Sequence, residues 1–244
     1  MFFQEIADWF SNQFNKTLIV QDRYTFYLEG LGNTLLISLG AVVIGILLGI
    51  LFATINYTNK KCGYFKITSK IVKFIIFIVR GTPVVLQLMI MYFVILAFVA
   101  DGILVSVITF GINSGAYVAE IFRGSLESVD DGQYEAGRAL GLNMFKTMIT
   151  IVIPQAFKAC IPALFNEFIA LVKETSVAGY IAIKDVTYAA YRVQSRTVDA
   201  FFPLIVSAVI YLALVGLLTM ALRFIERRLA KSDRQNKVLK RKSH

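Results

Sequence analysis

The sequence EAGRALGLNMFKTMITIVIP runs from Glu135 to Pro154 and places a short polar segment between long apolar ones. Asp130 can cap a helix here, with Gln133 three residues further on, and Gly141 can end it in a left-handed conformation. The helix has small residues (Ala136, Gly137, Ala139) for a flat face, with Glu135 and Arg138 as charges, which suits insertion into a groove of another protein. We therefore predict a docking helix near residues 130–141, although a simple turn would fit the same residues.

The composition indicates a membrane protein. Of 244 residues 57% are hydrophobic and 17% are charged, and the mean hydropathy of +0.67 is higher than that of an ordinary soluble domain. A bilayer requires roughly 20 mostly apolar residues per helix. The candidates lie near residues 31–55, 80–100, 102–123, 147–172 and 201–223. We predict an all-α membrane protein with about five transmembrane helices.

The basic residues indicate the orientation. They gather in the connection from Lys60 to Lys73 and in the tail from Arg223 to Lys242, and such clusters favour the cytoplasmic side. An odd number of spans then leaves the N-terminus outside. We predict an extracytoplasmic segment over residues 1–29 without a secretory signal, a transmembrane domain over 30–225 and a basic cytoplasmic tail over 226–244. The net charge of +9 would attract anionic lipid or an acidic partner and gives no reason to invoke nucleic acid.

Several chemistries find no support in the sequence. Cys62 and Cys160 are far apart and lack metal-ligand spacing, so we interpret them as packing residues and predict no metal site. The single histidine, His244, lies at the end of the tail, and no Gly-x-Ser-x-Gly elbow is present, which disfavours a membrane-embedded enzyme. The chain also lacks a Gly-x-x-x-x-Gly-Lys-Ser/Thr phosphate loop, so we expect it to bind no ATP itself.

Small residues recur every four positions in the first predicted span, at Ala41, Gly45, Gly49 and Ala53. This ladder predicts close approach of a neighbouring helix. After the following loop, lysines at 66, 70 and 73 share one helical face, which predicts a helix at the membrane interface before the second span.

Charged side chains within spans are expected to face the bundle interior with a partner. Arg80 and Glu120 should lie at similar depth, because the second span rises from the cytoplasm and the third returns to it. We predict an ion pair between them, with direct substrate contact as the alternative.

The fourth predicted span contains Pro154 and Pro162, which should bend or break the helix, and broken spans often mark substrate paths. Asn166 and Glu167 follow, and a carboxylate inside a span is a candidate functional group. The polar stretch over residues 173–199 is predicted to form an external loop with short helices.

The motifs taken together resemble the membrane permease subunits of ABC importers for polar amino acids, of the histidine, arginine and glutamine type. The resemblance covers roughly residues 28–225. It rests on Gly32-x-Thr34-Leu35, Arg80-Gly81-Thr82-Pro83, Ser114–Gly124, Gly132-Gln133-x-Glu135-Ala136 and Leu171-x-Lys173-Glu174-Thr175-Ser176. The importer signature falls on Glu135, Ala136, Gly137, Gly141, Ile151, Ile153 and Pro154. It departs from the usual pattern at Gly137, where the family has alanine, and at Ile153, where it has leucine.

This resemblance implies a type I importer fold in the inner membrane of a prokaryote. It also implies that Glu135, Ala136, Gly137 and Gly141 couple the chain to a separate ATP-binding subunit dimer, which carries ATP and Mg, while this chain binds no cofactor. A second permease subunit, identical or paralogous, and an extracytoplasmic amino-acid-binding protein would complete the assembly.

The substrate is expected to be a polar or basic amino acid such as arginine, lysine or histidine. Glu167, with Asn166 nearby, could bind a cationic side chain, because a guanidinium or ammonium relieves the cost of an unpaired buried carboxylate. A basic residue of this chain or of its partner could serve equally well. Gln87, Asn113 and Ser114 are further candidates for substrate contact, or else join helices to each other. Glutamine, glutamate or cystine as substrate, and a stand-alone secondary transporter, remain the alternatives.

Overall fold

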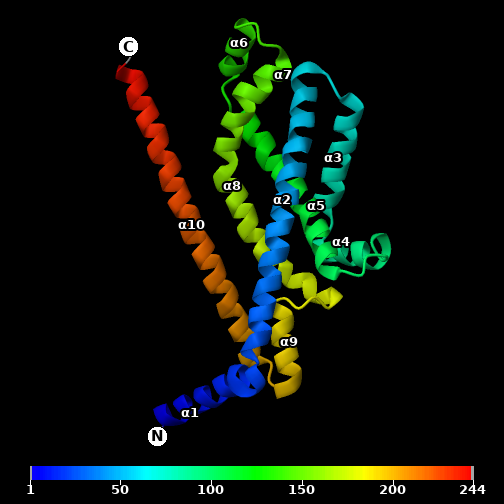
Figure 1. Ribbon diagram of the computed structural model, residues 1–244, viewed down its shortest axis with the longest axis vertical. Coiled ribbons are helices and arrows are strands. Elements are labelled where there is room, and N and C mark those ends of the chain that lie inside the picture. The colour runs from blue at the N-terminus through cyan, green and yellow to red at the C-terminus, as the bar shows by residue number, and fades with distance from the viewer. Residues whose placement is uncertain (1, 243–244) are drawn as a thin grey trace.

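The computed structural model describes residues 2–242, without the side chains of Cys62 and of residues 229–242. Long helices run side by side along the longest axis of the molecule (Figure 1). In chain order the segments are α1 (Phe2–Phe14), η1 (Asn15–Ile19), η2 (Val20–Asp22), α2 (Tyr24–Cys62), α3 (Lys66–Gly81), α4 (Val84–Ile90), η3 (Met91–Ile95), α5 (Gly102–Glu127), α6 (Asp131–Ala139), α7 (Met144–Thr147), η4 (Met148–Val152), α8 (Ile153–Glu174), η5 (Thr175–Ile181), α9 (Val186–Thr197) and α10 (Phe201–Lys242).

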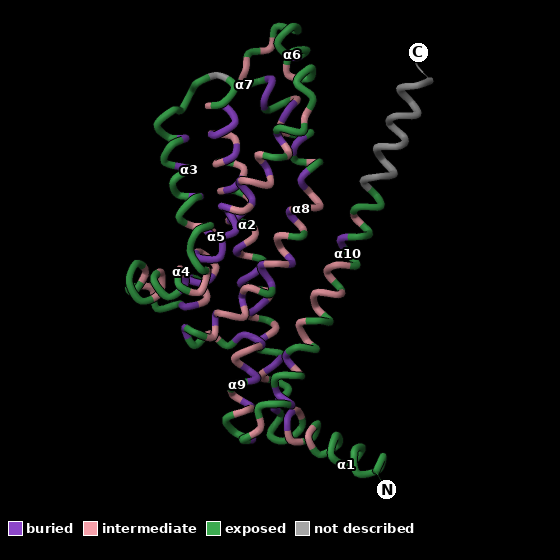
Figure 2. The backbone as a smooth tube through the Cα atoms, turned by 180° about the vertical axis from the view of Figure 1, so that it is seen from behind, coloured by how far each residue is buried: buried purple, intermediate pink, exposed green. Residues whose placement is uncertain are grey.

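The predicted number of about five spans is confirmed. Among the described residues four helical stretches are long and apolar enough to cross a bilayer, namely Tyr24–Lys61, Gly102–Glu127, Met144–Ile181 and Phe201–Arg228. A fifth span arises if Lys66–Gly81 and Val84–Ile95, bent by 108° at their junction, are counted together. Figure 2 shows the consequence for burial, since the buried residues follow the inner helices and the outer faces of α3 and α10 are exposed.

The α2–α5 pair forms the centre of the bundle, and glycines set its spacing. A Cβ atom on Gly45 would lie 2.8 Å from Ser114 Oγ, and one on Gly49 would lie 2.9 Å from the backbone nitrogen of Ala119. Such short distances show that the two backbones approach as closely as glycine allows. The structure thus agrees with the packing interpretation of the small-residue ladder.

The segment with the lysines at 66, 70 and 73 was expected to form an interfacial helix before the second span, but it is part of that span. α3 instead packs into the bundle, where Val72 and Ile76 bury against Ala116 and Ala119 of α5, and its lysines stay exposed. The helix breaks at Thr82, which is extended (φ −121°, ψ 146°) because the residue before a proline is driven out of the helical region.

The fourth span is not broken at Pro162. Pro154 lies in the first turn of α8, where a missing N–H costs little, and Pro162 lies inside a continuous helix. A π-helical turn, η4, precedes α8 and is the irregular part of this span. The sharp bend expected here therefore occurs at Pro83 instead.

The end of the bundle opposite α6 carries the predicted short helices, η5 and α9. Asp185 caps α9 and is fully buried, and Gly30 of α2 packs directly on its backbone. The first span begins at Tyr24, earlier than expected, and α1 leads away from this end across the bundle direction (Figure 1). The predictions for Cys62 and for most of the basic tail over residues 226–244 lie outside the described side chains.

Candidate functional site

α6 forms the tip of the bundle and has the caps that the sequence predicts. Asp130 Oδ1 accepts a 2.7 Å hydrogen bond from the backbone N–H of Gly132. At the other end Gly141 adopts φ +80°, and the N–H groups of Gly141 and Leu142 donate to the carbonyls of Arg138 and Gly137. These bonds satisfy groups that a short helix otherwise leaves open, so both ends of α6 are capped.

Gly137 faces inward, which corrects the expectation that it belongs to a flat outer face. It is the buried residue of α6. A Cβ atom there would lie 2.7 Å from Thr147 Cγ2 and 2.8 Å from Ile151 Cδ1. Glycine in place of the alanine usual in similar sequences therefore lets α6 seat directly on α7 and η4.

The outward side of α6 is apolar at its centre and bears a charge at its edge. Glu135, Ala136 and Ala139 are exposed, and the adjoining Leu140 is 80% exposed. The sequence analysis did not predict that Leu140 belongs to the docking surface. Its position four residues after Ala136 and directly before the capping glycine could have indicated this. A protruding leucine at the capped end of a helix can fill a groove in a partner protein.

Polar contacts join α6 to two spans. Lys61, near the end of α2, pairs with Asp131 at 2.6 Å, and Gln155 of α8 donates to Gln133 Oε1 at 3.3 Å. Lys60 pairs with Glu127 at 2.7 Å beside them. α6 thus contacts α7 and η4 through Gly137, α8 through Gln133 and α2 through Asp131.

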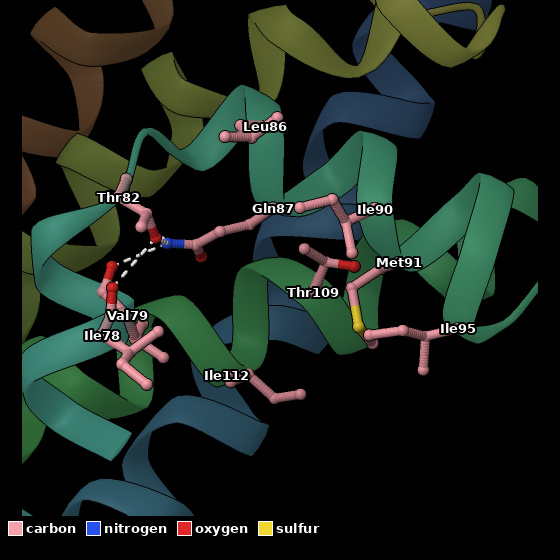
Figure 3. A pocket seen from close by; sticks show the side chains of 10 residues that line it. All are labelled: Ile78, Val79, Thr82, Leu86, Gln87, Ile90, Met91, Ile95, Thr109 and Ile112. Carbon is pink, nitrogen blue, oxygen red and sulfur yellow. Dashed lines mark hydrogen bonds between the residues drawn. The ribbon is translucent and has the colours of Figure 1, made fainter. Parts of the chain in front are cut away.

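Gln87 of α4 and Asn113 of α5 contact each other beside the bend of the second span. Asn113 Nδ2 donates to Gln87 Oε1 at 3.0 Å. Gln87 Nε2 in turn donates to Val79 O at 2.6 Å and Thr82 Oγ1 at 2.8 Å, as Figure 3 shows. These bonds close the end of α3 and tie it to α5, so both side chains join helices. A mostly apolar cavity of about 250 Å³ lies beside them, lined by Gln87, Thr109 and several aliphatic residues.

Glu167 and Ser114 form the second polar cluster, between α8 and α5. The Ser114 hydroxyl is buried and lacks a hydrogen-bond partner of ordinary geometry, and the Glu167 carboxyl lies close enough to interact with it. Within the described part of the chain, no lysine or arginine nitrogen lies within 4.0 Å of Glu167. Asn166, by contrast, is exposed. The structure brings Glu167 to Ser114 and leaves Asn166 apart from them.

The predicted ion pair between Arg80 and Glu120 is absent from the described contacts, and both residues have other partners. Glu120 Oε2 binds Arg123 on its own helix, at 3.1 Å from Nε and 2.8 Å from Nη2. The Arg80 guanidinium lies over the Tyr117 ring, 5.2 Å from its centroid. Arg80 thus reaches Tyr117, about one helical turn from Glu120, while Arg123 on the same helix already pairs with the Glu120 carboxylate.

The described side chains contain no cluster of three histidine, cysteine, aspartate or glutamate residues that could hold a metal ion. Cys160 is buried in α8 with a free thiol, which agrees with a packing role.

Comparison with known proteins shows the family. A profile described as "Binding-protein-dependent transport system inner membrane component" matches residues 30–231, which include α6 and every span apart from the first residues of α2. The chain belongs to this family. The prediction that the chain is an importer permease is confirmed. It is a transport subunit of the bacterial inner membrane.

Individual members of the family align over most of their length. The arginine transport system permease protein ArtQ of Bacillus subtilis (strain 168) is 39% identical over 211 residues, covering 85% of this chain and 94% of the relative. A Rickettsia typhi (strain ATCC VR-144 / Wilmington) protein, provisionally named the glutamine transport system permease GlnP, is 36% identical over 207 residues, covering 84% and 93%. A crystal structure described as an amino acid ABC transporter with histidines has a TM-score of 0.77 at 35% identity and covers 86% of this chain and 98% of that one. The type I importer fold predicted for this family member is thereby confirmed.

Proposed function

We propose that this family member is the permease subunit of an ATP-driven importer and carries a polar or basic amino acid. The single observation that supports the mechanism best is α6, a capped helix with an apolar outer face that is connected to two spans. The relatives named for arginine and glutamine transport support the class of substrate.

The proposed mechanism begins with an ATP-binding subunit dimer that receives Leu140 and the neighbouring small residues in a groove. Closure of that dimer, which carries the ATP and Mg, moves α6. Because Gly137 sits on Thr147 and Ile151, the movement reaches η4 and through it α8. The π-helical turn of η4 is an irregular point at which α8 can change direction. An equilibrium between inward-facing and outward-facing states then shifts.

The assembly would include a second permease subunit, either another copy or a paralogue, and an extracytoplasmic binding protein that delivers the amino acid. Glu167 is proposed to face the pathway and to accept the cationic group of a basic amino acid. Its position beside the buried Ser114 hydroxyl, without a lysine or arginine of the described chain in contact, supports this role. Glutamine, glutamate or cystine is the alternative substrate.

Uptake into proteoliposomes tests the proposal. We expect transport only when the chain, the ATPase, the binding protein and ATP are all present. Uptake by the chain alone under an ion gradient would instead indicate a secondary transporter.

A variant at the tip tests the docking step. Leu140→Asp should abolish capture of the ATPase subunit, because a charge replaces the apolar side chain that fills the groove. Val198→Asp, at an even more exposed position at the opposite end of the bundle, should leave capture unchanged. Normal capture by Leu140→Asp would overturn the proposed docking face.

A further inference from the structure

The helix α1 (Phe2–Phe14) has two faces of opposite character. At helical spacing its apolar residues fall on one side, and Gln4, Glu5, Asp8, Ser11 and Asn12 fall on the other. The apolar face consists of Phe2, Phe3, Ile6, Trp9, Phe10 and Phe14, all of which are exposed. Gln13 also falls within this face by helical spacing and is half-buried. An exposed and largely aromatic face of this kind marks an interaction surface. The family match begins at residue 30, so α1 lies outside it.

The position of α1 places this face at the boundary of the membrane. Gln21 and Asp22 adopt left-handed backbone conformations (φ 57° and 53°) and turn the chain between α1 and α2. As a result α1 runs across the bundle direction at the end where α2 and α10 both begin (Figure 1). The ends of apolar spans coincide with the level of the lipid headgroups.

The aromatic face of α1 continues an exposed apolar surface of α10. The rings of Trp9 and Phe10 pack edge-on against Phe202, with centroid distances of 6.4 and 5.3 Å. Phe202 is buried, but the neighbouring Phe201, Leu204 and Ile205 of α10 are exposed and apolar. Lipid that covers this part of α10 therefore also meets the face of α1.

The charge of α1 indicates which kind of lipid headgroup it contacts. α1 contains Glu5 and Asp8 and no lysine or arginine, and the first basic residue of the chain is Lys16 in η1. Interfacial helices that bind anionic lipid carry basic residues on the polar face, so α1 has the opposite character. Tryptophan is itself enriched where apolar chains meet headgroups.

We propose that α1 is an interfacial anchor that inserts its aromatic face into zwitterionic lipid and steadies the adjoining end of α10. The proposal rests on the proposed orientation only for the leaflet, which would be the outer one. It does not depend on the identity of the transported substrate.

Trp9 is the only tryptophan of the chain, so its fluorescence reports on α1 alone. The test uses the full-length permease chain in phosphatidylcholine vesicles, with bromine atoms placed at different depths of the acyl chains. An interfacial helix buries its apolar face about 5–10 Å into the headgroup and acyl boundary. We therefore expect emission shifted to the blue and strongest quenching by bromines near the glycerol end of the chains.

Matched variants separate the two faces of α1. Ile6→Asp adds a charge to the aromatic face and should reduce quenching by brominated lipid while exposing Trp9 to aqueous iodide. Ser11→Asp adds the same charge to the polar face and should leave both properties as in the wild type. Thermal unfolding of the two variants checks that the bundle is intact.

Three results would overturn the proposal. Iodide access without lipid quenching in the wild type would place α1 in water. Protection from both quenchers would show that a protein surface, such as a second copy of the chain, covers the aromatic face. Stronger lipid quenching in phosphatidylglycerol than in phosphatidylcholine would contradict the zwitterionic preference. Loss of amino-acid uptake with normal quenching would affect only the proposed transport function.

Discussion

Lys61 Nζ lies 2.6 Å from Asp131 Oδ1, so the last turn of α2 is joined directly to the first turn of α6. The side chains are 31% and 69% exposed. Exposed ion pairs contribute about 0–1 kcal/mol, whereas the seat of Gly137 on Thr147 and Ile151 is a steric contact that cannot be screened by salt. At high salt, where the ion pair is screened, the packing of Gly137 should still hold α6 on the bundle.

The first prediction concerns that ion pair. Asp131→Asn should lower the free energy of unfolding by about 1 kcal/mol or less, because water and salt already screen the pair. Uptake should stay close to the wild-type rate. A double-mutant cycle with Lys61→Gln in thermal unfolding checks the size of the coupling, and a loss of transport in Asp131→Asn would show that the pair itself transmits the movement.

The second prediction concerns Gly137. Gly137→Leu should uncouple ATP hydrolysis from uptake, because its side chain must displace α6 from η4. Gly137→Ala should be milder, since its Cβ meets side-chain atoms of Thr147 and Ile151 and no backbone atom. Gly124→Ala, at a helical glycine with open space around it, is the control. Full coupling in Gly137→Leu would contradict the proposed path.

The third prediction concerns Gly49. A Cβ atom there meets the backbone of α5, at 2.9 Å from Ala119 N, and backbone cannot rotate away. Overpacking of this kind costs about 1–3 kcal/mol, so Gly49→Ala should lower the midpoint of thermal unfolding in detergent. Gly216→Ala, where nothing lies within 4 Å, should be neutral or stabilising. Equal midpoints for the two variants would mean that α2 and α5 separate without cost.

The sequence predicts the features of this chain that depend on local chemistry. The length of the apolar runs predicts the spans, and Asp130 and Gly141 predict the two ends of α6. These signals suffice because a cap or an apolar run acts within a few residues.

The features that depend on distant contacts are not predictable in this way. Pro83 and Pro162 look alike in sequence, yet the helix breaks only at Pro83, where Gln87 binds the carbonyls of Val79 and Thr82 that the break leaves open. The inward orientation of Gly137 depends on η4, which follows only after a turn. The partner of Asp185 is likewise remote, since the hydroxyl of Tyr211 reaches it from α10.

The fourth prediction concerns Glu167. Glu167→Gln keeps the size of the side chain and removes its charge, so uptake of arginine or lysine should lose affinity about tenfold or more, the equivalent of about 1.5–3 kcal/mol for a hydrogen bond to a charged group. Assembly and basal ATP hydrolysis should be unchanged. Radiolabelled uptake by the reconstituted complex provides the measurement.

Glu174→Gln, seven residues further along the same helix, makes the same chemical change as a control. An equal loss in both variants would point to a general effect of charge, and unchanged uptake by Glu167→Gln would remove the residue from the pathway. Unaltered glutamine uptake in Glu167→Gln, in a complex that carries glutamine, would favour the alternative substrate.

The fifth prediction concerns pH and Asp185. Burial raises the pKa of the Asp185 carboxyl, although the N–H groups of Thr187 and Tyr188 and the Tyr211 hydroxyl oppose the shift. A carboxyl whose native pKa is raised binds its proton more tightly in the folded state than in the unfolded chain. Its contribution to stability is therefore complete below the unfolded value of about 3.9 and is lost as the pH rises through the native pKa.

Asp185→Asn removes this titration and keeps a side-chain oxygen that can cap α9. The midpoint of thermal unfolding of the wild type, relative to that of Asp185→Asn, should thus rise as the pH falls from neutral toward about 4. Tyr211→Phe keeps the carboxyl but removes a 3.2 Å hydrogen bond that favours its charged form, so the same pH dependence should move to higher pH. A wild-type midpoint that falls with acid relative to Asp185→Asn would show that hydrogen bonding, and not burial, governs this carboxyl.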